Sequence, residues 1–152
     1  MTHINPSLKI AVLTVSDTRT EETDKSGKTL VDRLTKAGHQ LAEKSILKDD
    51  KHLLSAKVAN RVADEVQVVL ITGGPGITGR YVTPDAISPL FDKEIPGFGE
   101  IFRMLSYDEI KTSTIQSRAI AGLSNSTLIF CLPGSTGACM TAWDKILKDQ
   151  LD

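Results

Sequence analysis

Residues 66–76, Val-Gln-Val-Val-Leu-Ile-Thr-Gly-Gly-Pro-Gly, decide the fold of this chain. The apolar, β-branched run at 66–71 is typical of a strand that is covered on both faces of a sheet. It leads directly into three glycines, which let the backbone turn tightly or approach a ligand closely. Because fully buried strands belong to parallel sheets with helices on both faces, the rest of the chain should alternate between strands and helices.

Apolar runs and helical spacing predict this alternation on both sides of the stretch. The elements predicted before it are a strand at 8–15, a helix at 26–37, a strand at 40–47 and a helix at about 53–62. Those predicted after it are a helix that begins at 83 and is ended or kinked by Pro89, helices at about 98–105 and 112–121, a strand at 127–132 and a helix at 137–148. Gly122 is the predicted stop of the helix at 112–121. The predicted fold class is therefore α/β, with three α/β/α layers and a mostly parallel sheet.

The composition is that of one ordinary globular domain. A chain of 152 residues without a repeat or a linker predicts a single domain over residues 1–152. Its 40% apolar and 24% charged residues are typical of a folded protein. Eighteen Lys and Arg against nineteen Asp and Glu give a net charge of −1, so the chain lacks the basic field that attracts nucleic acid.

Membrane spans, disulfides and histidine metal sites are not predicted either. No run approaches the roughly 20 apolar residues of a membrane span, and residues 1–7 do not resemble a secretory signal, so we expect a cytoplasmic protein without membrane contact. Cys131 and Cys139 are too few for a disulfide framework and are expected to be reduced packing residues. The three histidines lack the spacing of metal ligands.

Polar residues follow each of the four predicted strands at the point where the strand ends. They are Ser16 and Asp17, Asp49 and Asp50, the segment 72–76, and the segment 133–136. Ligands of open parallel sheets bind beyond the carboxyl ends of the strands. One edge of the sheet should therefore collect hydroxyls, carboxylates and glycines.

Each of these segments has both a functional and a purely structural explanation. The glycines at 73–76 are suited to a phosphate cradle of N–H groups, but a tight turn that binds nothing explains them equally well. Asp49, together with Asp17 or Asp24, is suited to Mg²⁺, but acids at a helix N-terminus are the more usual explanation. The segment 133–136 either donates to an anion or simply caps the last helix.

Several enzyme classes are not supported by the motifs of this chain. No Gly-x-x-x-x-Gly-Lys-Ser/Thr and no Gly-x-Gly-x-x-Gly motif occurs, which speaks against ordinary P-loop ATPases and dinucleotide dehydrogenases. No Ser-His-Asp or Cys-His arrangement suggests a covalent hydrolase. Ser117 and Arg118 fall in a predicted helix, where a solvent-exposed face explains them without a function.

Eight short motifs nevertheless occur in the order seen in the MoaB/MogA family of molybdenum cofactor biosynthesis proteins, and the chain resembles that family over nearly its whole length. They are Thr14-Val15-Ser16-Asp17-Thr18, Asp24-Lys25-Ser26-Gly27, Gly38-His39, Lys48-Asp49-Asp50, Thr72-Gly73-Gly74-Pro75-Gly76, Thr83-Pro84-Asp85-Ala86, Ser117-Arg118-Ala119 and Pro133-Gly134-Ser135-Thr136. Eight ordered motifs are far more specific than any one alone. The stretches 89–103 and 143–152 look most like the bacterial MoaB branch.

The resemblance implies an α/β molybdopterin-binding domain that assembles as homotrimers or homohexamers and contacts other enzymes of the pathway. Members of the family transfer AMP from Mg-ATP to the terminal phosphate of molybdopterin. Mg²⁺, ATP and molybdopterin are therefore the expected ligands. Such a transfer needs positioning, anion donors and Mg²⁺ more than a protein nucleophile, which agrees with the residues found here.

The matched motifs also imply roles for individual residues. Asp49 matches a family carboxylate that is tied to Mg-ATP and catalysis, and it is the implied Mg²⁺ ligand. The implied nucleotide-binding residues are Thr72, Gly73, Gly74 and Gly76. The implied molybdopterin-binding residues are Ser16, Asp24, Ser26, Ser117, Arg118, Pro133, Gly134 and Ser135.

Two positions depart from the family pattern. Pro75 stands where the family commonly has Thr, which removes an N–H and a hydroxyl donor from the glycine loop. Tyr81 stands where the family commonly has a second catalytic Asp. Because a neutral phenol does not replace a carboxylate as a Mg²⁺ ligand, a second hypothesis is a module that binds molybdopterin or docks on pathway enzymes without catalysis.

Overall fold

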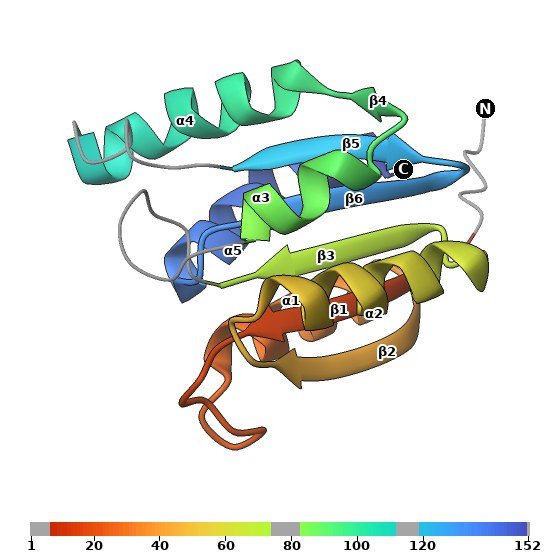
Figure 1. The fold of residues 1–152 in the computed structure, drawn as a ribbon. Helices are drawn as coiled ribbons and strands as arrows, with labels where there is room; N and C mark the ends of the chain where they lie inside the picture. The colour runs from red at the N-terminus through yellow and green to blue at the C-terminus, as the bar shows by residue number, and fades with distance from the viewer. Residues whose placement is uncertain (1–6, 74–82, 112–118, 152) are drawn as a thin grey trace.

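The computed structural model describes residues 7–73, 83–111 and 119–151, which form a six-stranded sheet between two layers of helices (Figure 1). The strands are β1 (Lys9–Val15), β2 (Gln40–Leu47), β3 (Val68–Thr72), β4 (Lys93–Glu94), β5 (Ile120–Ser124) and β6 (Thr127–Leu132). Their order is β2-β1-β3-β6-β5-β4, and β2, β1, β3 and β6 are mutually parallel. β5 is antiparallel to β6, and β4 is antiparallel to β5. The predicted mostly parallel sheet is confirmed.

Helices cover both faces of this sheet, as the three-layer prediction requires. They are α1 (Lys25–Lys36), α2 (Lys51–Ala63), α3 (Thr83–Ile87) with the 3₁₀ turn η1 (Ser88–Leu90), α4 (Pro96–Ile110), α5 (Thr136–Ala142), the π-helical segment η3 (Trp143–Leu147) and α6 (Lys148–Gln150). None of the helices within the described ranges combines the length and the apolar character needed to cross a membrane.

The strand alternation builds two hydrophobic cores, one on each face. In β1, Ile10 and Val12 belong to the core that α1, α4 and the C-terminal helices cover, whereas Ala11 and Leu13 belong to the core under α2 and α3. All four side chains are fully buried. Complete burial of a side chain of the size of Leu or Ile contributes about 1.5–3 kcal/mol, so β1 is anchored from both sides.

Two aspartates begin the helices that follow β1 and β2. The side chain of Asp24 accepts a hydrogen bond from the N–H of Gly27 and caps α1. The side chain of Asp50 accepts from the N–H groups of His52 and Leu53 and caps α2. Each cap satisfies N–H groups that the helix leaves without a partner. The structural explanation of Asp50, that it is an acid at the N-terminus of a helix, is therefore confirmed.

The prediction of a helix at 112–121 that stops at Gly122 is wrong in its described part. Residues 120–124 form β5, and Gly122 lies in the middle of this strand opposite Ile129. A Cβ atom at position 122 would overlap the ring of Phe91, so the glycine is needed for space rather than for ending a helix. Residues 112–118 lie outside the described residues. The two-residue strand β4 was not predicted.

Candidate functional site

The carboxyl ends of the parallel strands meet at one edge of the sheet, and the loops that leave them are bonded to one another. The N–H of Ser16 donates to the carbonyl of Leu47 at 2.8 Å, which joins the end of β1 to the end of β2. The N–H of Asp49 donates to Oδ1 of Asp17 at 3.0 Å and joins the next residues of the same two loops. The expectation that these segments gather at one edge is confirmed for the described residues.

Thr72 and Gly73 connect the end of β3 to the ends of the neighbouring strands, β6 and β1. The buried hydroxyl of Thr72 donates to the carbonyl of Pro133 at 2.8 Å and lies 3.2 Å from Sγ of Cys139. Gly73 has a φ of 138°, which favours glycine, and a Cβ atom there would overlap the backbone of Val15. Both residues therefore hold the edge together. Gly74 and Gly76, the other predicted nucleotide-binding residues, lie outside the described residues.

Asp24 is a buried carboxylate beneath the β1–α1 loop. Its Oδ2 accepts from the hydroxyl of Thr14 at 2.7 Å and from Nζ of Lys44 at 3.2 Å, while its Oδ1 accepts from the N–H of Gly27 at 3.0 Å. Burial raises the pKa of Asp24, but these hydrogen bonds and the charge of Lys44 outweigh burial and hold the pKa below its usual value. The side chain is 0% exposed, so Asp24 acts on the edge by fixing the loop.

Ser26 and the 133–135 segment are joined by a single carbonyl. The carbonyl of Gly134 accepts from the hydroxyl of Ser26 at 2.6 Å and from Nη2 of Arg19 at 3.0 Å. The preceding carbonyl, that of Pro133, accepts from Thr72. In a trans peptide the N–H points opposite to the carbonyl, so the N–H groups of Gly134 and Ser135 are directed away from these inner hydroxyls. Backbone N–H groups of this kind are suited to binding an anion.

Ser16 and Ser135 use their hydroxyls to shape the backbone. The Oγ of Ser16 accepts from the N–H groups of Thr18 and Arg19 at 3.2 and 3.0 Å. The Oγ of Ser135 accepts from the N–H of Ala138 at 3.1 Å and caps α5. Both hydroxyls thus support the loops in which the predicted site residues lie.

Arg19 was missed in the sequence, although its guanidinium lies between the two loops. It contacts both Ser26 and Gly134. Arg19 belongs to no recognisable periodicity, and the signal that could have singled it out is a cation in a loop that directly follows a buried strand.

Asp49 is half-buried in the loop between β2 and α2, and its backbone is bonded to Asp17. These two aspartates place oxygen ligands of the kind that Mg²⁺ prefers on adjoining loops. Within residues 7–73, 83–111 and 119–151, no three His, Cys, Asp or Glu side chains gather as a metal site. The residues present suit an ion that takes its remaining ligands from water and phosphate.

The two cysteines behave as predicted from their apolar surroundings. Both are buried and free. Burial raises the pKa of Cys139 to about 11, although hydrogen bonds from Thr72 and Ser26 lower it, and burial also raises the pKa of Cys131. Both thiols therefore stay protonated near pH 7 and are unsuited to nucleophilic chemistry.

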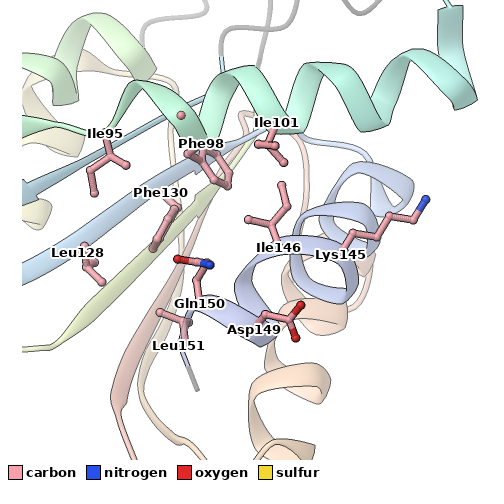
Figure 2. A pocket seen from close by; sticks show the side chains of 11 residues that line it. Ile95, Phe98, Ile101, Leu128, Phe130, Lys145, Ile146, Asp149, Gln150 and Leu151 are labelled. Atoms are coloured by element: carbon pink, nitrogen blue, oxygen red, sulfur yellow. The ribbon is translucent and has the colours of Figure 1, made fainter.

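An apolar cavity of about 460 Å³ lies elsewhere, between α4 and the C-terminal helices (Figure 2). Its walls include Phe98, Ile101, Phe130 and Ile146, and Leu128 places it toward the start of β6. None of the predicted site residues lines it. Ser117 and Arg118, like Pro75 and Tyr81, lie outside the described residues, so their predicted roles stay predictions.

Known proteins resemble this chain in sequence. A profile of the family described as a probable molybdopterin binding domain matches residues 11–152. Molybdenum cofactor biosynthesis protein B of Escherichia coli strain K12 is 55% identical over 145 residues, which cover 95% of this chain and 85% of that protein. The protein of the same name from Bacillus subtilis strain 168 is 51% identical over 146 residues, with 95% of this chain and 86% of that protein covered.

A solved structure also has the same fold. A crystal structure of a molybdenum cofactor biosynthesis protein B matches with a TM-score of 0.94 and 46% identity, covering 98% of this chain and 94% of that chain. A profile match over almost the whole chain and relatives of more than 50% identity show the family. This chain therefore belongs to the MoaB/MogA family of molybdenum cofactor biosynthesis proteins and resembles its bacterial MoaB members.

Proposed function

We propose that this chain binds molybdopterin by its terminal phosphate at the carboxyl edge of the sheet and transfers AMP from Mg-ATP to that phosphate. The observation that carries this proposal is the pair of carbonyls at Pro133 and Gly134 that accept from Thr72 and Ser26, so that the following amides point away from these hydroxyls. Asp49 lies on the same edge, after β2, with the parallel strands β1 and β3 between it and the 133–134 segment that follows β6. The edge thus offers donors for one phosphate and a carboxylate for a metal-bound triphosphate.

The reaction needs no covalent intermediate on the protein. An oxygen of the terminal phosphate of molybdopterin attacks the α-phosphorus of ATP, and a new P–O bond forms. The bond between this phosphorus and the bridging oxygen breaks, and pyrophosphate leaves with the electron pair. Mg²⁺, when bound, would neutralise charge on the triphosphate, and Asp49 with Asp17 would hold it. Positioning of the two anions is then the main contribution of the protein.

A second candidate function is favoured by one residue of the sequence. Tyr81 stands where the family commonly has a catalytic Asp, and a phenol is neutral near pH 7. If the second carboxylate is essential for transfer, this chain is a non-catalytic module that binds molybdopterin or docks on other enzymes of the pathway. The same edge would then bind the pterin phosphate without ATP chemistry.

Release of pyrophosphate from molybdopterin and Mg-ATP distinguishes the two candidates. For a catalytic chain we expect turnover by the unchanged protein and a loss of about 100-fold or more in Asp49→Ala, because a lost metal ligand removes several kcal/mol of transition-state stabilisation. Asp64→Ala serves as the control, since Asp64 follows the far end of α2 and its exposed carboxylate pairs with Arg61.

The possible results of this experiment point to different conclusions. Equal rates in the unchanged chain and in Asp49→Ala would remove Asp49 from the mechanism. Turnover by Tyr81→Asp alone would establish the non-catalytic module. Turnover by neither, together with no binding of molybdopterin, would contradict both candidates.

We also infer that the chain forms homotrimers or homohexamers and contacts other enzymes of the pathway. Support comes from α4, whose side chains Ile101, Met104, Tyr107 and Ile110 are 43–61% exposed. Four large apolar side chains on one helix are an unusual surface for a monomer.

A further inference from the structure

We propose that Arg19 is the cation that recognises the terminal phosphate of the pterin, so that it determines the preference of the site for a phosphorylated ligand. This role rests on the proposed function, and none of the family motifs discussed above assigns it.

The guanidinium of Arg19 is fixed before any ligand arrives. Nη2 donates to the carbonyl of Gly134 at 3.0 Å, and Nη1 donates to the hydroxyl of Ser26 at 3.4 Å. The backbone N–H of Arg19 is held by Oγ of Ser16 at 3.0 Å. Because both the backbone and the head of this long side chain are held, a ligand loses little affinity to ordering it.

The guanidinium still has donors to offer. It carries five N–H groups, of which one points to Gly134 and one to Ser26. Within the part of the chain that the structure describes, no further hydrogen bond from this guanidinium occurs, and the side chain is 34% exposed. Its planar fork suits two oxygens of one phosphate, which a lysine ammonium does not match.

The surrounding charges leave Arg19 able to attract an anion. Nη1 lies 3.8 Å from Oδ1 of Asp24, beyond hydrogen-bond distance. The carboxylate of Asp24 is shared, because its Oδ2 pairs with Lys44 at 3.2 Å. Two cations thus face one buried carboxylate. Glu21 pairs with Lys44 from the solvent side, where it is 67% exposed and screened by water.

The bond from Arg19 to the carbonyl of Gly134 ties the cation to the loop that carries the amides of Gly134 and Ser135. The N–H groups of Gly134 and Ser135 point away from the carbonyls that Arg19, Ser26 and Thr72 hold. The N–H of Ser135 lies on the opposite side of the peptide that joins Gly134 to Ser135 from Arg19, so the spare guanidinium donors form a second set of donors at the edge. A phosphate near this loop is attracted by the charge of Arg19 as well as by backbone amides.

Binding measurements with two ligands test this assignment. We would compare the Kd of molybdopterin with that of its dephosphorylated form for the unchanged chain, Arg19→Gln and Arg19→Lys. We expect Arg19→Gln to weaken molybdopterin binding by about 10–100-fold, as for a charged hydrogen-bond pair, and the dephosphorylated form by less than about 3-fold. Arg19→Lys should restore part of the difference, because it keeps the charge without the fork.

Arg33→Gln is the matched control. Arg33 lies on α1 with a side chain that is 31% exposed, and it pairs with Asp144 at 3.0 Å. We expect it to bind both ligands like the unchanged chain. Thermal unfolding of each variant shows whether it is folded, and Arg19→Lys alone suffices for the comparison if Arg19→Gln does not fold.

Two results would overturn the assignment. An unchanged Kd for molybdopterin in Arg19→Gln would show that Arg19 does not contact the phosphate. An equal loss for both ligands would show that Arg19 only braces the loop. If the unchanged chain binds neither ligand, the proposed function itself fails, and that result is distinct from the other two.

Discussion

Asp24 keeps its charge although its side chain has no contact with solvent. The cost of burying a carboxylate is offset by hydrogen bonds from Thr14, Gly27 and Lys44. Because Asp24 also caps α1, the direction in which the chain leaves β1 depends on this ionised group. Any change that neutralises it should loosen the loop that carries Ser16 and Arg19.

Acid should therefore remove the stabilisation that Asp24 provides. The pKa of Asp24 is lowered in the folded chain, so its contribution is present above the unfolded pKa of about 3.9 and is lost as the pH falls through the folded pKa. We expect Asp24→Asn to lower the free energy of unfolding by about 2–4 kcal/mol at pH 7, since charged hydrogen bonds within a buried pair are lost. The difference from the unchanged chain should shrink below about pH 3.9.

Urea unfolding at a series of pH values measures this effect. Asp32→Asn, on an exposed position of α1, is the control and should change the free energy of unfolding by less than about 0.5 kcal/mol. A difference between Asp24→Asn and the unchanged chain that is constant down to pH 2 would contradict the role given to the charge.

Lys44 should show the opposite dependence of stability on pH, at alkaline pH. Its burial lowers its pKa, but Glu21 and Asp24 outweigh burial and raise it, so its contribution is lost as the pH rises through the folded pKa.

At the level of single residues, the sequence indicated which loops form the edge but not what each side chain does there. Ser16, Asp24 and Ser26 were predicted as ligand contacts, whereas in the structure their oxygens are bonded to other parts of the chain. Those partners lie up to 108 residues away, as for Ser26 and Gly134. Local patterns do not contain such pairings. Arg19 was overlooked for the same reason, because its importance arises only from Gly134.

Among the elements, β5 depends on a contact between a glycine and an aromatic ring. Phe91 lies before β4, which is two residues long and pairs with β5 at the edge of the described sheet. A Cβ atom at Gly122 would overlap the Phe91 ring, so the close approach of this ring to β5 requires glycine. The outer part of the sheet is therefore sensitive to one methyl group.

We expect Gly122→Ala to lower the free energy of unfolding by about 1–3 kcal/mol through overpacking. Combination with Phe91→Ala should recover part of this loss, because the clash partner is absent, and a double-mutant cycle measures the coupling. Gly97→Ala is the control, since a Cβ atom there meets nothing within 4 Å and α4 should tolerate it. Strictly additive effects at positions 91 and 122 would argue against the contact.

The success of element prediction followed the strength of the local signal. The strand at 127–132 and the start of the helix at 83 are confirmed, because an apolar run and a Thr-Pro-Asp start are local features. β5 was mistaken for the end of a helix because the helical spacing predicted for 112–121 ran up to Gly122, and glycine is typical of a helix stop. Its pairing with β6 overrides that preference. The break of the last helix into a π-helical turn at Trp143 had no visible signal.

At the scale of the whole molecule, α4 carries more exposed large apolar side chains than any other helix among the described residues. Ile101 and Met104 lie one turn apart, so they share a face, and Ile101 also lines the apolar cavity of Figure 2. In Figure 1, α4 runs along the outer side of the molecule beside β5. A second copy of the chain seated on α4 would remove this surface from water.

We expect Met104→Glu to convert the predicted trimer or hexamer into smaller species, because a charge buried in an apolar interface is costly. Sedimentation or light scattering of the purified variant measures the mass. Leu53→Glu is the control, since Leu53 is 51% exposed on α2 against the other core, and its mass should match that of the unchanged chain. A monomeric unchanged chain would refute the assembly, and dissociation by Leu53→Glu alone would place the interface on α2.

The central place of β6 in the sheet also governs how the fold can be completed during synthesis on the ribosome. Val68 of β3 pairs with Leu128 of β6. About 60 further residues must therefore be translated before the edge of β3 that does not pair with β1 can be covered. The apolar side chains on one face of β1 and β3 stay partly uncovered for longer, until Trp143 and Leu147 have been synthesised and can pack on them. A nascent chain paused between these points presents an open strand and bare apolar side chains, and it is then that chaperones have most to bind.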